Sequence, residues 1–428
     1  MVKKNNNATK EAKAVAVKVK SGGQMPAGKS YSKPPETVGA DVPENEYYSA
    51  VAGKIKLAKW CIIFFLVVFS LGGMILNSNE LNFGNAGYLL KDIDIPGQAK
   101  AKPEFYIESD EGASICYYKN NIAVLRKNRL DIYNIAGKKS LISRLAYSNP
   151  VLVASEKYML SYDLGNNKLE IFNAFSKVFE YSESQPIYGA CVTDKGNVAY
   201  ITSEYGYASV VYVLNGSFSP IFRCFFESDY IVAADIDDKA TRLAAVGFYV
   251  NQGDYLGKLV LYETDSETRV STVEVPGERP YGVKVTEGGV FAIFDSSLRC
   301  YAQKGDELLR YDFKNKKLAA AELGPELAAI VLSEPTLKTD NRILIFDEGG
   351  NILYDNAIAL EIIDIKLSKD SKFLYFLARS GLYKVDIGQK TFESVEGDYD
   401  ETADCIVYAN DKNIFLSGLA KINVLSAK

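Results

Sequence analysis

Two kinds of hydrophobic pattern divide this chain of 428 residues. From about residue 104 to the end, short runs of apolar residues, many of them alternating with polar ones, are separated by turns rich in Gly, Asn, Asp and Ser, which predicts β-strands. Before this region lies one continuous apolar run, Trp60–Leu76, of seventeen residues without a charge. We therefore expect an all-β C-terminal region that is preceded by one apolar helix.

The strand-like region repeats itself with a period near forty residues. Each unit is marked by a strand that ends in an aromatic or aliphatic residue and runs into a polar turn, and successive units are 39, 41, 49, 39, 45, 39 and 40 residues apart. About four short strands per unit at this period predict the blades of a β-propeller. The marker strands start at Leu130, Leu169, Val210, Leu259, Leu298, Ile343, Leu382 and Ile422.

The last unit stops after its third strand. Cys405–Ala409, Asn413–Ser417 and Lys421–Leu425 supply three strands, and we expect Glu104–Glu108 to add the fourth and so close the ring. The prediction is an eight-bladed β-propeller. A seven-bladed ring is the alternative if Leu318–Leu332 is divided differently.

The charges around the apolar run predict an orientation in a membrane. Seventeen apolar residues are at the short end of what crosses a bilayer. Residues 1–76 carry eleven Lys and five acidic residues, net +6, so the remainder carries −5 − 6 = −11. Lys54, Lys56 and Lys59 precede the run, and no Lys or Arg follows it before Lys91, so the positive-inside rule predicts a cytoplasmic N-terminus. A cleaved signal peptide is the competing interpretation, but fifty-nine residues are too many for its n-region.

The sequence thus predicts a single-pass cell membrane protein with four segments. Residues 1–56 are expected to be a disordered, basic cytoplasmic tail, because they contain few large apolar residues. Residues 57–77 are expected to be a transmembrane signal anchor, residues 78–103 a stalk, and residues 104–428 the extracytoplasmic β-propeller.

The tail contains a P-loop-like segment. Gly23–Ser30 matches the pattern G-x-x-x-x-G-K-[ST]. A working P-loop needs a buried strand before it and a helix after it, and Pro34 and Pro35 break any such helix. We therefore expect no nucleotide at this segment.

Composition excludes several kinds of chemistry. The chain has no His, which removes imidazole general bases and His-ligated metals. Five of its six Cys follow the apolar run without a C-x-x-C pair, so we expect buried free thiols. Asp235, Asp237 and Asp238 admit a calcium interpretation, but Asp is an ordinary residue of tight turns, and we predict no metal and no cofactor. The net charge of the C-terminal part argues against nucleic acid.

Some propeller families are excluded by their motifs. The WD dipeptide is missing, and the one Trp is Trp60, outside the repeats. The chain consists, in order, of a basic tail, a single apolar run and then units such as NNIAVLRKNRLDIYN (120–134) and GYASVVYVLNG (206–216). In this order of its parts it resembles the Gram-positive membrane-anchored proteins grouped as domain-of-unknown-function family 5711. The resemblance covers most of residues 104–428. It implies a propeller-like domain and supplies no catalytic residues.

In a propeller, the turns between strands b and c and the turns between strand d and the next strand a emerge on one face. Candidate binding residues lie in these turns in units three to five. Tyr and Arg dominate binding hot spots, because they bury a large area while keeping a polar tip. The competing interpretation is that Tyr is simply abundant, with 29 in the chain, and that the tyrosines between strand d and the next strand a fill the central channel. The candidates are Tyr188, Tyr205, Tyr207, Tyr230, Phe248, Tyr249, Tyr255, Arg279 and Tyr281.

These observations favour a non-enzymatic binding or scaffold module for a cell-envelope protein or wall polymer, since the sequence contains no recognisable catalytic constellation. The alternative is a carboxylate-dependent glycan hydrolase or lyase on the propeller face. Such an enzyme needs no His, because paired carboxylates perform its chemistry. Its candidate acids are Asp229, Asp254 and Glu278.

Overall fold

The computed structural model describes residues 46–76, 102–109, 112–174, 176–399, 402–410 and 412–427. The chain divides into two compact units, Met1–Gly73 and Met74–Lys428. The P-loop-like segment and most of the predicted tail and stalk lie outside the described residues.

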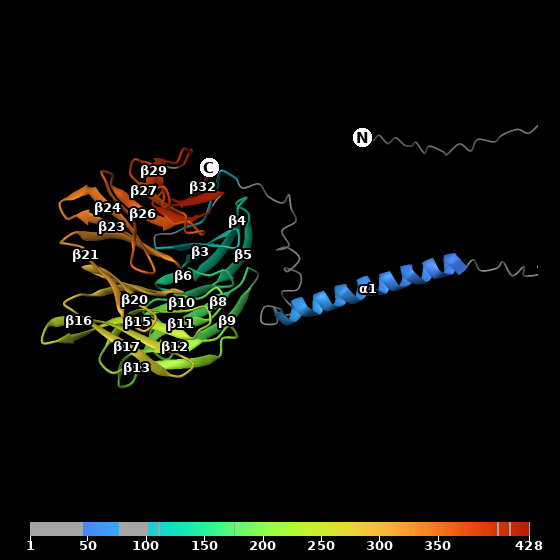
Figure 1. Cartoon of the computed structure of the whole chain (residues 1–428), viewed down its shortest axis with the longest axis horizontal. Coiled ribbons are helices and arrows are strands. Elements are labelled where there is room, and N and C mark those ends of the chain that lie inside the picture. The colour runs from blue at the N-terminus through green and yellow to red at the C-terminus, as the bar shows by residue number, and fades with distance from the viewer. Residues whose placement is uncertain are drawn as a thin grey trace, which may run out of the picture. The chain divides into compact units, whose positions relative to one another are not determined.

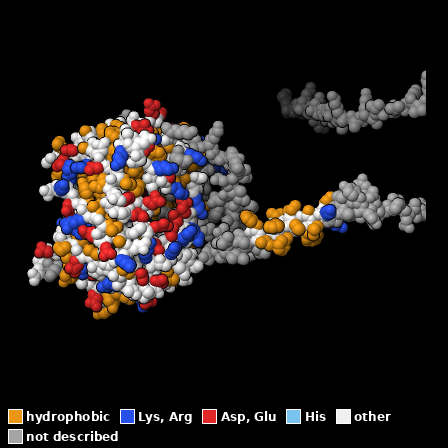
Figure 2. Space-filling view, viewed as in Figure 1, with side chains coloured by type: hydrophobic (Ala, Val, Ile, Leu, Met, Phe, Trp, Pro, Cys, Tyr) orange, Lys and Arg blue, Asp and Glu red, His pale blue; other side chains and the backbone are white. Residues whose placement is uncertain are grey.

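Helix α1 spans Glu46–Leu76 and contains the whole apolar run. It begins before the predicted start at residue 57, so the last part of the tail, which we expected to be disordered, is helical, consistent with its lack of Pro. The described side chains of α1, from Lys54 to Ser70, are all exposed, and hydrophobic ones cover most of this stretch (Figure 2). Among the described residues no helix was found to have the length and apolar character for crossing a membrane, so the predicted span is not confirmed.

The described residues from 102 onward form eight antiparallel sheets of four strands, the blades of a β-propeller (Figure 1). Seven blades use four consecutive strands, a to d, and the first strands of neighbouring blades contact one another along most of the ring. The predicted eight-bladed, all-β propeller is confirmed. Leu318–Leu332 falls in the first two strands of blade six, which decides against a seven-bladed ring.

The strand bounds are as follows. Blades one to four contain β2 (Ser114–Tyr118), β3 (Asn121–Arg126), β4 (Arg129–Asn134), β5 (Lys139–Arg144); β6 (Pro150–Ala154), β7 (Met159–Asp163), β8 (Lys168–Phe172), β9 (Lys177–Ser182); β10 (Gly189–Val192), β11 (Val198–Glu204), β12 (Tyr207–Leu214), β13 (Pro220–Phe226); and β14 (Tyr230–Ile236), β15 (Arg242–Asn251), β16 (Asp254–Glu263), β17 (Thr268–Pro276). Blades five to eight contain β18 (Pro280–Val285), β19 (Gly289–Phe294), β20 (Ser297–Ala302), β21 (Glu307–Asp312); β22 (Lys317–Leu323), β23 (Leu327–Glu334), β24 (Leu337–Asp347), β25 (Ile352–Ile358); β26 (Ile362–Leu367), β27 (Phe373–Ala378), β28 (Gly381–Asp386), β29 (Thr391–Ser394); and β30 (Cys405–Ala409), β31 (Asn413–Ser417), β32 (Lys421–Ser426), β1 (Glu104–Tyr106).

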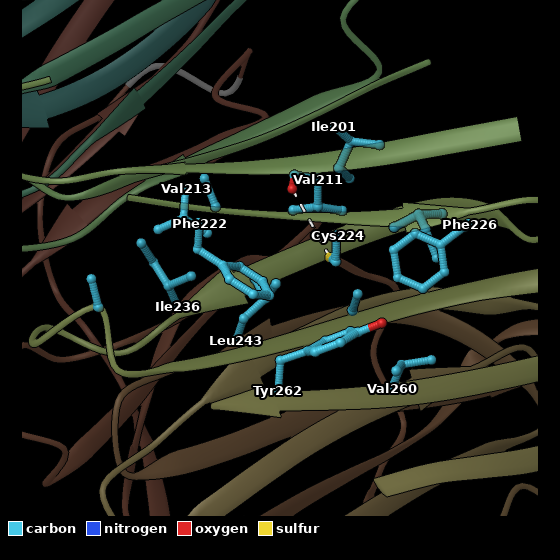
Figure 3. Close-up of a cluster of buried hydrophobic side chains, with 14 residues drawn as sticks. Ile201, Val211, Val213, Phe222, Cys224, Phe226, Ile236, Leu243, Val260 and Tyr262 are labelled. Atoms are coloured by element: carbon cyan, nitrogen blue, oxygen red, sulfur yellow. Dashed lines mark hydrogen bonds between the residues drawn. The ribbon is translucent and has the colours of Figure 1, made fainter. Parts of the chain in front are cut away.

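The core lies between neighbouring blades rather than in one central mass. The middle strand β19 is buried along its whole length, whereas the outer strand β5 alternates between half-buried and exposed positions. This difference arises because the middle strands are covered on both faces by adjacent blades, and the outer strands border solvent. Between blades three and four, apolar side chains from both sheets interdigitate (Figure 3). They include Ile201, Val211, Cys224, Phe226, Leu243 and Tyr262.

The first and last strands close the ring. β1 pairs antiparallel with β32, with Phe105 opposite Ile422, so the predicted fourth strand of blade eight is confirmed. Phe105 is buried beside Tyr133 of blade one, with ring centroids 6.4 Å apart. Blade eight therefore joins residues that are more than three hundred positions apart, and its closure depends on both ends of the domain.

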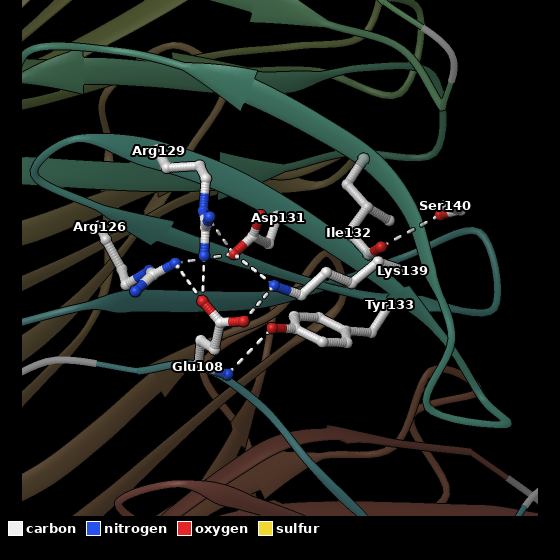
Figure 4. Close-up of polar contacts among 8 residues, drawn as sticks. All are labelled: Glu108, Arg126, Arg129, Asp131, Ile132, Tyr133, Lys139 and Ser140. Atoms are coloured by element: carbon white, nitrogen blue, oxygen red, sulfur yellow. Dashed lines mark hydrogen bonds and ion pairs between the residues drawn. The ribbon is translucent and has the colours of Figure 1, made fainter.

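An ion-pair network fixes the chain just after β1 (Figure 4). The Glu108 carboxylate accepts hydrogen bonds from Lys139 Nζ at 2.6 Å, from Arg126 at 3.1 Å and from Arg129. The buried carboxylate of Asp131 accepts from Arg126 at 2.9 Å and from Arg129 at 3.0 Å. The hydrogen bond from Lys139, together with the charges of Lys139 and Arg129, lowers the pKa of Glu108 to about 2. The network thus ties the closing strand to blade one.

The order of strands defines two faces of the ring. Because consecutive strands are antiparallel, all turns between strands a and b and between c and d lie at one face, and all turns between b and c and between d and the next a lie at the other. In blade eight, strand d (β1) begins and strand c (β32) ends at the first of these faces. We call this the entry face and the opposite one the far face.

Candidate functional site

Four of the predicted binding residues form a continuous row on the far face, over blades four and five. Tyr230 pairs with Phe248 across β14 and β15, and their ring centroids are 5.7 Å apart. Phe248 lies 5.6 Å from the ring of Tyr255, and the guanidinium of Arg279 lies 4.7 Å from the Tyr255 centroid. The Tyr230 residue is 54% exposed and the Arg279 side chain 64%. We call Tyr230, Phe248, Tyr255 and Arg279 the aromatic patch.

The backbone beneath the aromatic patch requires glycine at one position. A Cβ atom added to Gly247 would lie 2.6 Å from the Tyr230 carbonyl oxygen, so any other residue there would push β14 away from β15. The register of this strand pair shifts between Ile231 and Ala233, directly beside the patch. Such an irregularity re-aims side chains at the end of a strand. Gly247 thus allows Tyr230 and Phe248 to lie against each other.

The other predicted residues lie on the same face but outside this row. Tyr207 packs against Phe225 of its own blade at 4.7 Å, and Tyr249 faces Lys258, whose ammonium lies 5.5 Å from the ring. Three further aromatic residues are exposed on this face, two in turns that flank strands of blade three and one at the start of β18. They are Tyr188, Tyr205 and Tyr281.

Acidic residues border the aromatic patch. Asp229 precedes Tyr230 and accepts a hydrogen bond from Lys258 Nζ at 2.7 Å. The Asp295 carboxylate lies 3.8 Å from the guanidinium of Arg279, the same guanidinium that lies over the Tyr255 ring. Asp254 lies exposed at the turn between β15 and β16. The surroundings of the patch are therefore more acidic than basic.

Two of the three acids of the glycan-hydrolase alternative serve the fold. Glu278 is buried, pairs with Arg299 at 2.6 Å and accepts a hydrogen bond from the Ser297 hydroxyl at 2.5 Å. Asp229 is held by Lys258, as described above. A general acid or nucleophile must reach a substrate, and the contacts of Glu278 leave it enclosed by its own blade. This geometry favours a structural role for Glu278.

A large cavity opens on the entry face, at the mouth of the central channel. It has a volume of about 1340 Å³ and is lined by the inner strands and by turns between strands a and b of blades one, two, three, seven and eight. Tyr117 and Tyr408 stack on its wall with centroids 3.8 Å apart. None of the functional residues predicted from the sequence lies here, because these turns contain the Asp, Lys, Ser and Asn of ordinary hairpins. The structure reveals that turns distant in the sequence meet around one opening.

Charged residues on the inner strands tie neighbouring blades together. Lys284 of β18 pairs with Asp235 of β14 at 3.0 Å, and Lys366 of β26 pairs with Glu322 of β22 at 2.8 Å. Burial acts to lower the pKa of Lys284, but the nearby Asp235 outweighs it, and the pKa lies above its ordinary value. These ion pairs join the inner strands of neighbouring blades and so stabilise the wall of the central channel.

The calcium interpretation of the acidic turn in blade four is not supported by its contacts. Asp235 binds Lys284, and Asp237 accepts hydrogen bonds from the backbone N–H groups of Thr241 and Arg242 at 2.7 and 2.8 Å. These are the contacts of a turn residue. Among the described residues no group of three or more acidic or Cys side chains has a geometry that would hold a metal ion.

All six cysteines are free thiols, as predicted, but their burial differs. Of the five that were expected to be buried, Cys224 and Cys300 are buried, Cys116 and Cys191 are half-buried, and Cys405 is exposed as a residue. The Cys405 thiol nevertheless lies against Asp364, and partial burial together with that carboxylate raises its pKa to about 12. The exposure of Cys405 thus comes from its other atoms.

Comparison with known proteins identifies a family and the fold. The sequence profile of a family described as "Family of unknown function (DUF5711)" matches residues 98–419, which is 322 of 428 residues. Among curated proteins none matches the chain significantly.

Solved structures support the propeller. A computationally designed protein, Ika8, is 11% identical with a TM-score of 0.57, covering 75% of this chain and 98% of its own. Sqt1 from Chaetomium thermophilum, solved bound to the N-terminus of ribosomal protein L10, is 11% identical with a TM-score of 0.52, covering 76% and 99%. A eukaryotic initiation factor is 12% identical with a TM-score of 0.52, covering 77% of this chain and 88% of its own. At these identities the likeness establishes the fold alone.

Proposed function

Because the chain belongs to the Family of unknown function (DUF5711), its relatives assign it no activity, and we propose a function from its own geometry. The protein is a non-enzymatic, membrane-anchored extracytoplasmic propeller that binds a protein of the cell envelope through the aromatic patch. The observation that carries this proposal is the unbroken row of contacts from Tyr230 to Arg279 on an exposed face.

The composition of the aromatic patch supports a protein partner. Tyr and Arg are the residues most enriched in binding hot spots, and a rigid row of them loses little conformational entropy when a partner covers it. The acidic border disfavours an anionic wall polymer and favours a partner with basic or neutral groups. Sqt1, which has a similar fold and was solved bound to the N-terminus of a ribosomal protein, is an example of a propeller that binds a protein segment.

The anchor is the second part of the proposal. The seventeen residues Trp60–Leu76 include eleven Leu, Ile, Phe and Val, and the described side chains of α1 are exposed on every side. A helix that is apolar all round needs an apolar environment, such as a bilayer. The lysines before the run and the scarcity of basic residues after it support a cytoplasmic tail and an external propeller.

Cysteine labelling tests the anchor and its orientation. In a chain carrying Cys61→Ser and Cys405→Ser, Ser21→Cys reports on the tail, and the exposed Ser228→Cys reports on the far face. We expect a membrane-impermeant maleimide to label Ser228→Cys in intact cells and Ser21→Cys only after permeabilisation. Recovery of the chain in the fraction of soluble proteins, or labelling of both positions in intact cells, would contradict the proposal.

Site-specific crosslinking tests the binding surface. A photoreactive phenylalanine at Tyr281, an exposed position at the start of β18 and two residues after Arg279, should crosslink to one envelope protein in intact cells. The same group at Tyr106, exposed on β1, is the matched control. The crosslink should disappear when Tyr230, Tyr255 and Arg279 are all replaced by Ala in a chain whose melting temperature is unchanged. Identical products from both positions, or a crosslink that survives the triple substitution, would refute the proposal.

A further inference from the structure

The mouth of the central channel offers a second site, on the face opposite the aromatic patch. Its volume of about 1340 Å³ exceeds the roughly 300–1,000 Å³ of most small-molecule pockets, which leaves room for a short chain of linked units. The turns supply polar lining residues, and the inner strands supply the apolar Ile115, Leu152 and Val407 together with Lys366, which is paired with Glu322. A ligand of this site therefore has polar groups that remain at the mouth.

An ion pair from distant blades lies at this opening. Lys369, in the turn between strands a and b of blade seven, pairs with Glu156, in the corresponding turn of blade two, and the two residues are 213 positions apart. Blades eight and one lie between them, so the pair joins turns that are not neighbours in the ring. Both side chains are 57% exposed. Exposed ion pairs stabilise a fold very little, so these two side chains can exchange partners at small cost.

The ion pair restricts the charge of a ligand that replaces it. An anion that binds Lys369 removes the counter-ion of Glu156, and a cation that binds Glu156 removes the counter-ion of Lys369. A ligand with both an ammonium and a carboxylate restores a partner to each side chain. A peptide with free ends carries both charges at neutral pH, because its amino group has a pKa near 8 and its carboxyl group one near 3.5.

Asparagine side chains at the mouth provide donors for peptide carbonyls. The Oδ1 atom of Asn134 accepts hydrogen bonds from Ala136 N at 3.1 Å and Lys138 N at 2.9 Å, and that of Asn410 accepts from Lys412 N at 2.9 Å and Asn413 N at 2.8 Å. The amides are thereby fixed by their own turns. Among the described residues neither Nδ2 atom has an acceptor, so both are available to a ligand.

We propose that the channel mouth binds a short peptide with free amino and carboxyl ends, which places its carboxylate on Lys369 and its ammonium on Glu156. Its backbone carbonyls accept hydrogen bonds from Asn134 and Asn410, and its side chains face Ile115, Leu152 and Val407 of the inner wall. This site is independent of the aromatic patch, since the two lie on opposite faces of the ring.

Four alanine tripeptides that differ only at their ends test this proposal. They are trialanine, its N-acetyl form, its C-terminal amide and the form blocked at both ends, and their dissociation constants for the full-length chain in detergent can be measured by ligand-observed NMR. We expect trialanine to bind and each single block to weaken binding about tenfold. Equal affinity for all four peptides, or no binding of trialanine at about 10 mM, would overturn the proposal.

Two substitutions assign the ends of the peptide. Each variant removes the partner of one charge of the peptide. In Lys369→Gln, blocking the carboxyl end should no longer weaken binding, whereas acetylation of the amino end still should. In Glu156→Gln, acetylation should no longer weaken binding, whereas blocking the carboxyl end still should. Lys338 and Glu361 form a comparable ion pair on the far face at 3.8 Å, so Lys338→Gln with Glu361→Gln is the matched control and should leave all four affinities unchanged. If Lys369→Gln and Glu156→Gln bind all four peptides as the unmodified chain does, this assignment is wrong.

Discussion

Phe105 of β1 lies directly opposite Ile422 of β32, and this pairing completes the eighth blade with strands from the two ends of the domain. Both side chains are buried in one cluster with Ile122 and Phe415, so the contact also joins blade eight to blade one. The ring is therefore closed by apolar packing as well as by backbone hydrogen bonds. Its weakest point should be the strand of three residues that arrives from the other end of the chain.

Shortening Phe105 should destabilise the closed ring. Phe105→Ala removes a buried aromatic side chain and leaves a cavity, which typically costs about 3–5 kcal/mol of unfolding free energy. Denaturant unfolding followed by circular dichroism measures this change. The adjacent Tyr106 is 73% exposed, so Tyr106→Ala should change the stability by less than about 0.5 kcal/mol. Equal effects of the two substitutions would show that β1 does not hold the ring closed.

The ion-pair network around Glu108 should make stability depend on pH in the acid range. The pKa of Glu108 is lowered from 4.5 to about 2 in the folded protein, so the unfolded chain binds the proton more readily. The stabilisation from Glu108 is therefore complete above pH 4.5 and is lost as the pH falls toward 2. As the pH is lowered from about 7 to about 2, the melting temperature should fall less steeply for Glu108→Gln than for the unmodified chain. Glu396→Gln, at an exposed position, should retain the original slope.

The propeller could be predicted from the sequence because its information is local. Strand alternation and turn residues recur about every forty residues, and the unit that ends at β32 lacks a strand that Glu104–Glu108 can supply. Both features depend only on positions along the chain. The helical start at Glu46 was missed because a polar, lysine-containing segment has no apolar periodicity that indicates a helix.

The candidate sites could be predicted only where neighbouring turns contribute. Tyr230, Phe248 and Tyr255 come from one blade, and Arg279 comes from the turn that leads to the next, so their proximity follows from strand order. The pair of Lys369 and Glu156 could not be foreseen, because it depends on the diameter of the ring and on side-chain conformations across two intervening blades. No periodic signal in a sequence encodes such a contact.

Removing the buried carboxylate of Glu278 should unfold the protein more readily rather than abolish an activity. Glu278→Ala leaves Arg299 buried without its main partner, and breaking a buried ion pair in this way costs about 3–5 kcal/mol. Asp254→Ala, at the exposed turn of blade four, should cost less than about 0.5 kcal/mol. Chemical unfolding of both variants provides the comparison. Loss of turnover of labelled wall glycans in a stably folded Asp254→Asn variant would instead favour the hydrolase alternative.

The five thiols of the propeller should resist alkylation while the protein is folded. Burial raises the pKa of Cys116, Cys191, Cys224, Cys300 and Cys405 to about 12 in each case. At about pH 8 only about one such thiol in ten thousand is ionised, and the thiolate is the species that reacts with iodoacetamide.

Mass spectrometry of intact protein after timed alkylation should therefore show slow modification of these five thiols in the native state and rapid modification of all of them in guanidinium chloride. Asp364→Asn provides an internal comparison, because it removes the carboxylate that disfavours the Cys405 thiolate and should speed the reaction of this thiol alone. Rapid alkylation of Cys224 or Cys300 in the native protein would mean that the packing between blades opens far more often than a closed ring allows.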